Sequence, residues 1–171
     1  RQTDALVRRL MDLPQPLVLD ADGINALAGH MDEWERRRGR VTVLTPHEGE
    51  FLRVGGDLSQ GRTAAATEFA HQSGAVVVLK GPGTVVAGPD GRCRVNTTGN
   101  CGMAKGGSGD VLSGVVLALL GLGMDAFDAC CCAVWLHGRA GDLAAQEKGQ
   151  WGMTPTDLLE RLPQALREVT E

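Results

Sequence analysis

Three short runs of apolar residues, separated by segments of helical length, constrain the fold of this chain more than any other feature. They cover residues 17–19, 41–44 and 75–79, and polar residues follow each of them. The apolar positions are largely continuous rather than alternating, which is typical of strands buried on both faces of a parallel sheet. Helices between such strands place the sheet between two helical layers. We therefore predict an α/β fold with three layers, α/β/α, and a mostly parallel central sheet.

The rest of the chain divides into helices and one strand–turn–strand unit. The segment "TVVAGPDGRCRVN" (84–96) predicts two strands joined at Pro89-Asp90-Gly91, because these residue types favour tight turns. Apolar spacing predicts helices over residues 2–11, 23–38, 59–74, 108–120, 126–147 and 154–168, with a short helix after Pro46. No repeat or low-complexity linker interrupts this pattern. We therefore interpret residues 1–171 as one domain or as part of one.

Composition excludes several classes of partner. Of the 171 residues, 43% are hydrophobic and 22% are charged, with a formal net charge of −4. This balance offers no basic surface for nucleic acid, and no apolar run approaches the ~20 residues of a membrane span. The five cysteines show no metal-binding spacing, so we interpret the three at 130–132 as small buried hydrophobes in a reducing cytoplasm. The basic run at 36–40 is interpreted as the solvated end of a helix.

Four polar clusters follow the predicted strands or open a predicted helix. Ligands of open α/β sheets gather at the carboxyl ends of the strands, so we expect these clusters to lie together. The clusters are "DADGIN" (Asp20, Asp22 and Asn25), "TPHEGE" (Thr45, His47, Glu48 and Glu50), "KGPGT" (Lys80, Gly81, Pro82, Gly83 and Thr84) and "GGSGD" (Gly106, Gly107, Ser108, Gly109 and Asp110).

The "GGSGD" cluster predicts an anion site at the start of a helix. A glycine-rich turn lets backbone N–H groups converge on one point, and the helix dipole adds partial positive charge there. A carboxylate at this position opposes an anion, so Asp110 needs a separate explanation. It either caps the helix or acts as a base that takes a proton from a hydroxyl beside the anion hole. Spacing alone leaves both alternatives open.

The other clusters carry paired interpretations as well. Lys80 either meets phosphate oxygens or is an exposed strand end, and His47 either binds a polar substrate or is a surface residue. Glu50 either holds Mg²⁺ through water or is a helix-terminal carboxylate. Asp20 and Asp22 would share one face of a strand, although Asp22 could instead cap the next helix. The chain contains no GxxxxGK[ST], GxGxxG or GxSxG motif.

Four motifs in one order connect these clusters to a known family. "VLDADGIN", "TPHEGE", "VVLKGPGT" and "NTTGNCGMAKGGSGDVLSGVV" resemble the C-terminal two-thirds of the NAD(P)H-hydrate dehydratases. These are ribokinase-like domains that are often fused behind an epimerase domain in bacteria. The resemblance implies a ribokinase-like fold over nearly the whole chain. It also implies that residues 1–171 are the C-terminal portion of a single such domain, which lacks the family's N-terminal third.

The resemblance further implies an activity. The family restores NADH or NADPH from the S-form of its hydrate and spends ADP in bacterial and archaeal members, or ATP in eukaryotic ones. The chemistry is kinase-like: phosphoryl transfer to the ring hydroxyl is followed by loss of phosphate. Mg²⁺ is the implied cofactor. NAD(P)H hydrate, the nucleotide, an epimerase and further copies of the same chain are the implied partners, with neither nucleic acid nor membrane among them.

Residue roles follow by position. Asp110 is similar to the family's catalytic aspartate, which accepts the hydroxyl proton and touches the hydrate, and His47 is similar to its substrate-contacting histidine. Glu50 lies where ribokinase relatives keep the glutamate that orders Mg²⁺. Asn96 and Asn100 are expected to shape the loop before the anion hole, and Asp20, Asp22 and Asn25 to support the site. The nucleotide-binding positions implied are Lys80, Gly81, Pro82, Gly83, Thr84, Gly107, Ser108 and Gly109.

Three departures from the family pattern and two rival functions stand beside this interpretation. Glu48 replaces a common proline, which predicts a looser loop, and Ser108 replaces the usual threonine. Lys105 is an extra positive charge beside the expected phosphate site. One rival is a hydroxymethylpyrimidine or hydroxyethylthiazole kinase of the same superfamily, which would accumulate a phosphorylated product. The other is a nucleotide-sensing module without catalysis.

Overall fold

Five strands form one mixed sheet at the centre of the computed structural model, which describes residues 2–170. The strands are β1 (Leu17–Leu19), β2 (Thr42–Leu44), β3 (Val76–Leu79), β4 (Val85–Ala87) and β5 (Cys93–Val95), and they lie in this order across the sheet. The first three run parallel, with Leu19 opposite Leu44 and Leu44 opposite Val77. The last two form the predicted antiparallel hairpin.

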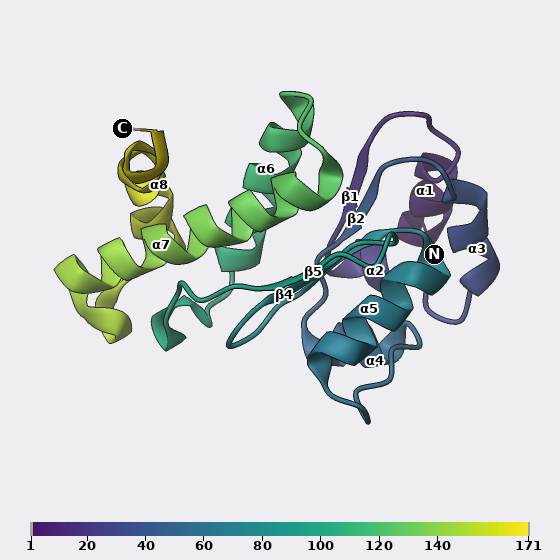
Figure 1. Ribbon diagram of the computed structural model, residues 1–171, viewed down its shortest axis with the longest axis horizontal. Helices are drawn as coiled ribbons and strands as arrows, with labels where there is room; N and C mark the ends of the chain where they lie inside the picture. Colours follow the sequence, from purple (N-terminus) through teal and green to yellow (C-terminus); the bar gives the residue numbers. More distant parts are fainter. Residues whose placement is uncertain (1, 171) are drawn as a thin grey trace.

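Helices cover both faces of the sheet and confirm the predicted α/β/α layers (Figure 1). The helices α1 to α5 lie on one side, whereas α6 and α7 lie on the other and α8 packs against α7. Their bounds are α1 (Gln2–Leu10), α2 (Asp22–Asn25), α3 (Met31–Arg37), α4 (Glu48–Arg53), α5 (Arg62–Ser73), α6 (Ser108–Gly121), α7 (Ala126–Gly152) and α8 (Pro155–Thr170), with a 3₁₀ turn η1 at Cys101–Met103.

The side chains of the strands alternate between two cores because successive residues of a strand point to opposite faces. Leu44, Val77 and Leu79 enter the core beneath α1 to α5, which also contains Phe51 and Trp34. The intervening valines, among them Val43, Val76, Val78 and Val86, enter the core beneath α6 and α7. Both faces of the sheet are therefore buried, as the continuous apolar runs predicted.

The prediction of one helix over residues 23–38 was wrong. The structure divides this segment into α2 and α3, which are separated by a turn at residues 26–30. Gly29 has a φ of 76°, a left-handed conformation that ends a helix and that glycine adopts without steric cost. The apolar spacing continues through the turn because Leu27 faces the same core as Ile24, so periodicity alone did not reveal the break.

The basic run at 36–40 is also not simply a solvated helix end. The side chain of Arg37 is buried, at 2% exposure, between α3 and the start of β2. Its guanidinium donates to the carbonyl oxygens of Leu13, Gln15 and Val41 and to Oγ1 of Thr42, at 2.6–2.9 Å. Burial lowers the pKa of Arg37. This arginine therefore joins α3 to the segment that precedes β1.

All five cysteines are free thiols. Cys130 is fully buried in the core of α6 and α7, and burial raises its pKa to about 12, so it behaves as the small hydrophobe that we predicted. Cys131 and Cys132 are only partly buried. Within residues 2–170, no helix combines the length and apolar character that crossing a bilayer requires.

Candidate functional site

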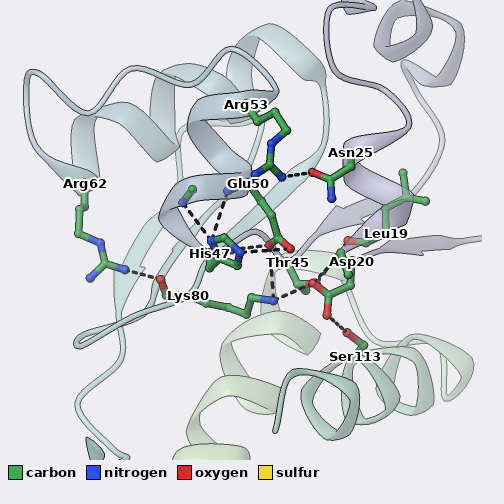
Figure 2. A network of polar contacts seen from close by, with 12 residues as sticks. Leu19, Asp20, Asn25, Thr45, His47, Glu50, Arg53, Arg62, Lys80 and Ser113 are labelled. Carbon is green, nitrogen blue, oxygen red and sulfur yellow. Dashed lines mark hydrogen bonds and ion pairs between the residues drawn. The ribbon is translucent and has the colours of Figure 1, made fainter. Parts of the chain in front are cut away.

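The three parallel strands end at one edge of the sheet and bring the first three polar clusters together (Figure 2). Backbone hydrogen bonds extend beyond the strands: Thr45 N donates to Leu19 O at 3.1 Å, and Lys80 N donates to Pro46 O at 2.8 Å. Asp20 follows β1, His47 follows β2 and Lys80 follows β3, so the three residues lie side by side at the ends of their strands. The predicted convergence of polar side chains at the carboxyl edge is confirmed for these residues.

The Lys80 ammonium group is the centre of a charged network at this edge. Its Nζ lies 2.7 Å from Oδ1 of Asp20 and 3.9 Å from Oε2 of Glu50. Asp20 is held in turn by the Ser113 hydroxyl on α6, which donates to Oδ2 at 3.2 Å, and by the N–H of Ala21. Strand ends β1 and β3 are thereby tied to the helix that carries Asp110.

His47 and Glu50 form a reciprocal cap at the start of α4. Nδ1 of His47 accepts from the N–H groups of Gly49 and Glu50, at 3.0 and 3.3 Å, while Oε2 of Glu50 accepts from His47 N at 2.8 Å. Such a capping box satisfies N–H groups that the helix leaves free. Because Nδ1 accepts, Nε2 carries the hydrogen in the neutral ring. Nε2 lies 3.4 Å from Oε1 of the buried Glu50, while the imidazole as a whole is 57% exposed and open to a ligand.

Arg62, the first residue of α5, fixes the loop at 80–84. Its guanidinium donates to the carbonyl oxygens of Leu79, Lys80 and Pro82, at 2.6–3.1 Å. The carboxylate of Glu48 forms an ion pair with this guanidinium, with Oε1 at 3.3 Å from Nε. The expectation that Glu48 loosens its loop is therefore not met, because the capping box fixes the turn and the ion pair joins it to the neighbouring loop.

The glycine-rich turn places free backbone donors at the start of α6. Gly107 has a φ of 98° and is the N-cap residue, a conformation that favours glycine. Within residues 2–170, the N–H groups of Gly109 and Asp110 have no hydrogen-bond acceptor. A side chain at Gly109 would lie 3.3 Å from Oδ2 of Asp20 and 3.5 Å from Nζ of Lys80. Free donors at the start of α6 suit an anion, and the Lys80 ammonium lies against Gly109, which carries one of them.

Asp110 does not cap α6. No side chain caps this helix, and among residues 2–170 nothing forms a hydrogen bond or ion pair with the Asp110 carboxylate. Its side chain is exposed at the first turn, next to the free N–H groups. Of the two alternatives that the sequence left open, the structure removes capping and leaves a carboxylate available to a ligand.

The loop that leads to the anion hole is bound to the middle of α7. Nδ2 of Asn96 donates to Val134 O at 3.2 Å, and the Thr98 hydroxyl donates to Trp135 O at 3.0 Å. Asp142 accepts from Gly99 N at 2.9 Å and from Nδ2 of Asn100 at 3.0 Å. The residues at 96–100 thus take their shape from a helix that follows them in the chain.

Lys105 does not extend toward the anion hole as an extra positive charge. Its Nζ donates to the carbonyl oxygens of Gln150, Trp151 and Met153 at the end of α7, at 3.4, 3.0 and 2.5 Å. A cation at a helix C-terminus is favourable, because carbonyl groups are unsatisfied there. Lys105 therefore fastens the loop at 101–107 to α7.

Asp22 and Asn25 lie apart from this network. Asp22 is the first residue of α2 and is exposed, because β1 ends at Leu19 and the chain turns at Ala21 before the second aspartate. Asp20 and Asp22 accordingly do not share a strand face. Oδ1 of Asn25 accepts a hydrogen bond from Arg53 of α4, so its side chain joins α2 to α4 at the margin of the site (Figure 2).

Comparison with known proteins identifies the family. The profile of the NAD(P)H-hydrate dehydratase family matches residues 1–164. The chain belongs to this family. The chain is 47% identical over 161 residues to a protein of Thermofilum pendens named bifunctional NAD(P)H-hydrate repair enzyme. The match covers 92% of this chain but only 30% of that protein.

Solved structures confirm the ribokinase-like fold. The chain matches a Bacillus subtilis ADP/ATP-dependent NAD(P)H-hydrate dehydratase that was co-crystallised with ATP/Mg²⁺ and soaked with CoA, with a TM-score of 0.81 and 37% identity. That match covers 95% of this chain and 59% of the other. A ribokinase-like superfamily protein of Enterococcus faecalis matches with a TM-score of 0.80 and 25% identity, over 96% of this chain and 58% of that one. This dehydratase-family chain therefore spans about three fifths of the solved relatives' length.

A cavity of about 350 Å³ lies between β5 and α7 of this family member. Its walls include Val86 and Val95 of the hairpin and Phe127, Val134 and Trp135 of α7. Asn96 also lines it and donates through its backbone N–H to Thr84 O at 2.8 Å. The cavity thus adjoins the loop at 80–84.

Sequence reasoning missed four residues that build the site: Arg62, Ser113, His137 and Asp142. A weak signal existed for three of them. Arginine in the first turn of a helix opposes the helix dipole, which indicates that Arg62 has another partner. The polar and glycine-containing stretch "HGRAGD" (137–142) interrupts an otherwise apolar helix, and such glycines usually have a packing reason. The remaining contacts join segments far apart in the chain.

Proposed function

We propose that the protein which carries this chain restores NAD(P)H from the S-form of its hydrate by nucleotide-dependent dehydration, with ADP as the phosphoryl donor. One observation carries the proposal: the unpartnered Asp110 carboxylate lies beside the free N–H groups of α6, and the Lys80 ammonium lies beneath them. A base, an anion hole and a cation are the parts that phosphoryl transfer to a hydroxyl needs. Family membership and the names of the relatives support this substrate.

The residues of this chain fit two successive steps. In the first, Asp110 accepts the proton of the ring hydroxyl, and the hydroxyl oxygen attacks the terminal phosphorus of the nucleotide. The bond from that phosphorus to the bridging oxygen breaks at the same time. The N–H groups at 109–110 and the Lys80 ammonium stabilise the transferring group. In the second, the ring nitrogen lone pair expels phosphate, and loss of a neighbouring carbon-bound proton restores the dihydronicotinamide. Nε2 of His47 can donate to the hydrate and orient it.

The charges of the site fit a requirement for Mg²⁺. Asp20, Glu50 and Asp110 carry three negative charges near the single ammonium of Lys80, so an anionic nucleotide meets net repulsion. Mg²⁺ prefers one or two protein carboxylates together with phosphate oxygens and water. Within residues 2–170, no group of three or more ligating side chains could hold a metal alone, which agrees with a cation that arrives with the nucleotide. Glu50 is the carboxylate that we expect to order it, and the ion would neutralise phosphate charge.

The proposed partners follow from the same relatives. The Thermofilum relative is named as bifunctional. We therefore propose an epimerase, fused or separate, as a functional partner that supplies the S-form. A homo-oligomer is proposed as the assembly on the family resemblance alone. The nucleotide is expected at the loop 80–84 and at the glycine-rich turn 107–109.

The test is recovery of the near-ultraviolet absorbance of the dihydronicotinamide. The full-length protein that carries this chain receives S-hydrated NADH, Mg²⁺ and either ADP or ATP, beside an Asp110→Asn control. We expect recovery with ADP and a loss of at least about a hundredfold in the control, because general-base catalysis contributes on this scale. The control should still bind nucleotide, since its backbone donors remain.

Other outcomes separate the rival functions. A phosphorylated product that accumulates from hydroxymethylpyrimidine or hydroxyethylthiazole, without hydrate turnover, would assign the protein to the small-molecule kinases. Nucleotide binding with no turnover of any of these compounds would favour a sensing module. Equal recovery with Asp110→Asn would remove Asp110 from its proposed role.

A further inference from the structure

His137 is a buried histidine for which the proposed chemistry has no use. It lies in the middle of α7, is 9% exposed, and its Nε2 is 2.8 Å from the carbonyl oxygen of Ser108. A carbonyl oxygen only accepts, so Nε2 carries the hydrogen and donates it. The hydrogen bond therefore joins α7 to Ser108, the first residue of α6.

The acceptor of this bond belongs to the peptide unit that supplies an anion-hole donor. The Ser108 carbonyl and the Gly109 N–H form one peptide group, which is planar and trans. The N–H and C=O bonds of such a group point in opposite directions. A donor that holds the carbonyl on the α7 side therefore directs the Gly109 N–H away from α7. Gly109 itself lies against Asp20 and Lys80, since a side chain there would be 3.3 Å from Oδ2 of Asp20 and 3.5 Å from Nζ of Lys80. A hydrogen bond to the carbonyl also polarises the peptide group and strengthens its N–H as a donor.

The surroundings keep the imidazole neutral, so that it stays a donor of one fixed tautomer. Burial, and to a smaller extent the charge of Lys80, lower the pKa of His137 to about 4, although the bond to Ser108 opposes this shift. The next residue, Gly138, also fixes the position of α7 against the loop at 96–100. It packs directly on Thr98, because a side chain at Gly138 would lie 2.2 Å from Oγ1 of Thr98. The same helical turn thus sets both the leading loop and the first peptide of α6.

We propose that His137 is a positioning residue for the anion hole, which fixes the orientation of the Ser108–Gly109 peptide group through its carbonyl and so aims the Gly109 N–H at the transferring phosphoryl group. This inference rests on the proposed function for its substrate. It assigns to α7 a part in transition-state stabilisation without contact between His137 and any reacting atom.

Three variants of the full-length protein test it. His137→Gln keeps an N–H donor at nearly the position of Nε2, His137→Asn keeps an amide that is too short to reach, and His137→Leu removes the donor. We expect kcat with ADP to fall about tenfold to a hundredfold in the Asn and Leu variants, a loss below that of a direct oxyanion donor, and to recover in the Gln variant to within about threefold. The KM for ADP should change less than kcat, since the aimed donor acts mainly in the transition state. His71→Leu, on the exposed surface of α5, is the matched control.

The outcomes separate the inference from the proposed function. No turnover by the unmodified protein defeats the proposed function itself. Turnover that is normal in the Asn and Leu variants overturns the positioning role, as does an equal fall of kcat in the Gln and Asn variants. If the Leu variant fails to fold, the comparison of Gln with Asn decides, because both are amides of similar polarity that differ in reach.

Discussion

At the scale of single residues, we predict that the ion pair Lys80–Asp20 contributes more to the stability of the fold than exposed ion pairs do. Both side chains are about four fifths buried, at 22% and 17% exposure, and the pair is held by Ser113. A double-mutant cycle with Asp20→Asn and Lys80→Met should give a coupling energy of about 1–3 kcal/mol. The exposed pair Arg38–Glu35 is the control and should give roughly 0–1 kcal/mol. Denaturant unfolding of the unmodified protein and of the two single variants and one double variant of each pair measures both coupling energies, and equal values would contradict the prediction.

Arg37 is expected to be among the most sensitive charged positions in the described part of the chain. Replacement by Met removes the Arg37 donor from the carbonyl groups of Leu13 and Gln15 and from the Thr42 hydroxyl. The Val41 carbonyl also loses a donor but keeps the N–H of Leu17. We expect Arg37→Met to lower the free energy of unfolding by about 3 kcal/mol, within the range for breaking buried charged contacts. Arg38→Met, one residue later but exposed, should change it by less than about 1 kcal/mol. Thermal and denaturant unfolding would show whether the two variants differ.

Residues at the ends of strands were predictable, whereas residues that act from a neighbouring helix were not. Asp20, His47 and Lys80 were located because a buried strand and its direction can be recognised in the sequence, and parallel strands end at one edge. Arg62 and His137 reach the site from helices, and the sequence reveals a helix by its apolar positions rather than by its polar ones. Nothing in a local pattern states which distant carbonyl a buried polar side chain will meet.

At the scale of elements, α7 is predicted to control the glycine-rich loop through its close contacts. Gly138→Ala should increase helix propensity by about 1 kcal/mol, but its new methyl group would lie 2.2 Å from Oγ1 and 2.7 Å from the carbonyl carbon of Thr98. Backbone must therefore move, and we expect a net loss of about 1–3 kcal/mol and weaker nucleotide binding. Gly114→Ala on α6 meets nothing within 4 Å and should stabilise the protein by about 0.5–1 kcal/mol. Unfolding and nucleotide titration of both variants test this contrast.

The elements themselves followed well from the sequence, and the exceptions have a physical cause. Strand positions and the long helices were predicted to within a few residues, because burial on both faces or on one stripe leaves a clear pattern. The break between α2 and α3 was missed since Gly29 turns the chain without interrupting the apolar spacing. The shape of the loop at 96–107 could not be predicted, because its hydrogen bonds are made to α7.

At the scale of the whole molecule, the buried His137 predicts how stability depends on pH. Its pKa is about 4 in the folded chain and close to 6.5 when unfolded, so between these values the unfolded state binds more protons. Stability should therefore fall as the pH falls from about 6.5 to 4, by about 3 kcal/mol in total. Below pH 4 this contribution is constant, and above pH 6.5 it is absent.

The same experiment can isolate this contribution from the carboxylates. Hydrogen bonds lower the pKa values of four exposed carboxylates, which are Asp57, Asp90, Asp157 and Glu168. The small stability that they contribute is lost at the acid end of the histidine window and below it, and it is common to both proteins that are compared. Between pH 7 and 4, denaturant unfolding should show that the unmodified protein loses about 3 kcal/mol of stability relative to His137→Gln, because glutamine has no proton to gain. Parallel curves would mean that His137 has the same pKa in the folded and the unfolded chain, so that burial would not hold the ring in its neutral form as we infer. A relative loss of this size, together with a kcat that falls in the Asn variant and is kept in the Gln variant, would show that one buried imidazole sets both the acid limit of the fold and the direction of an anion-hole donor.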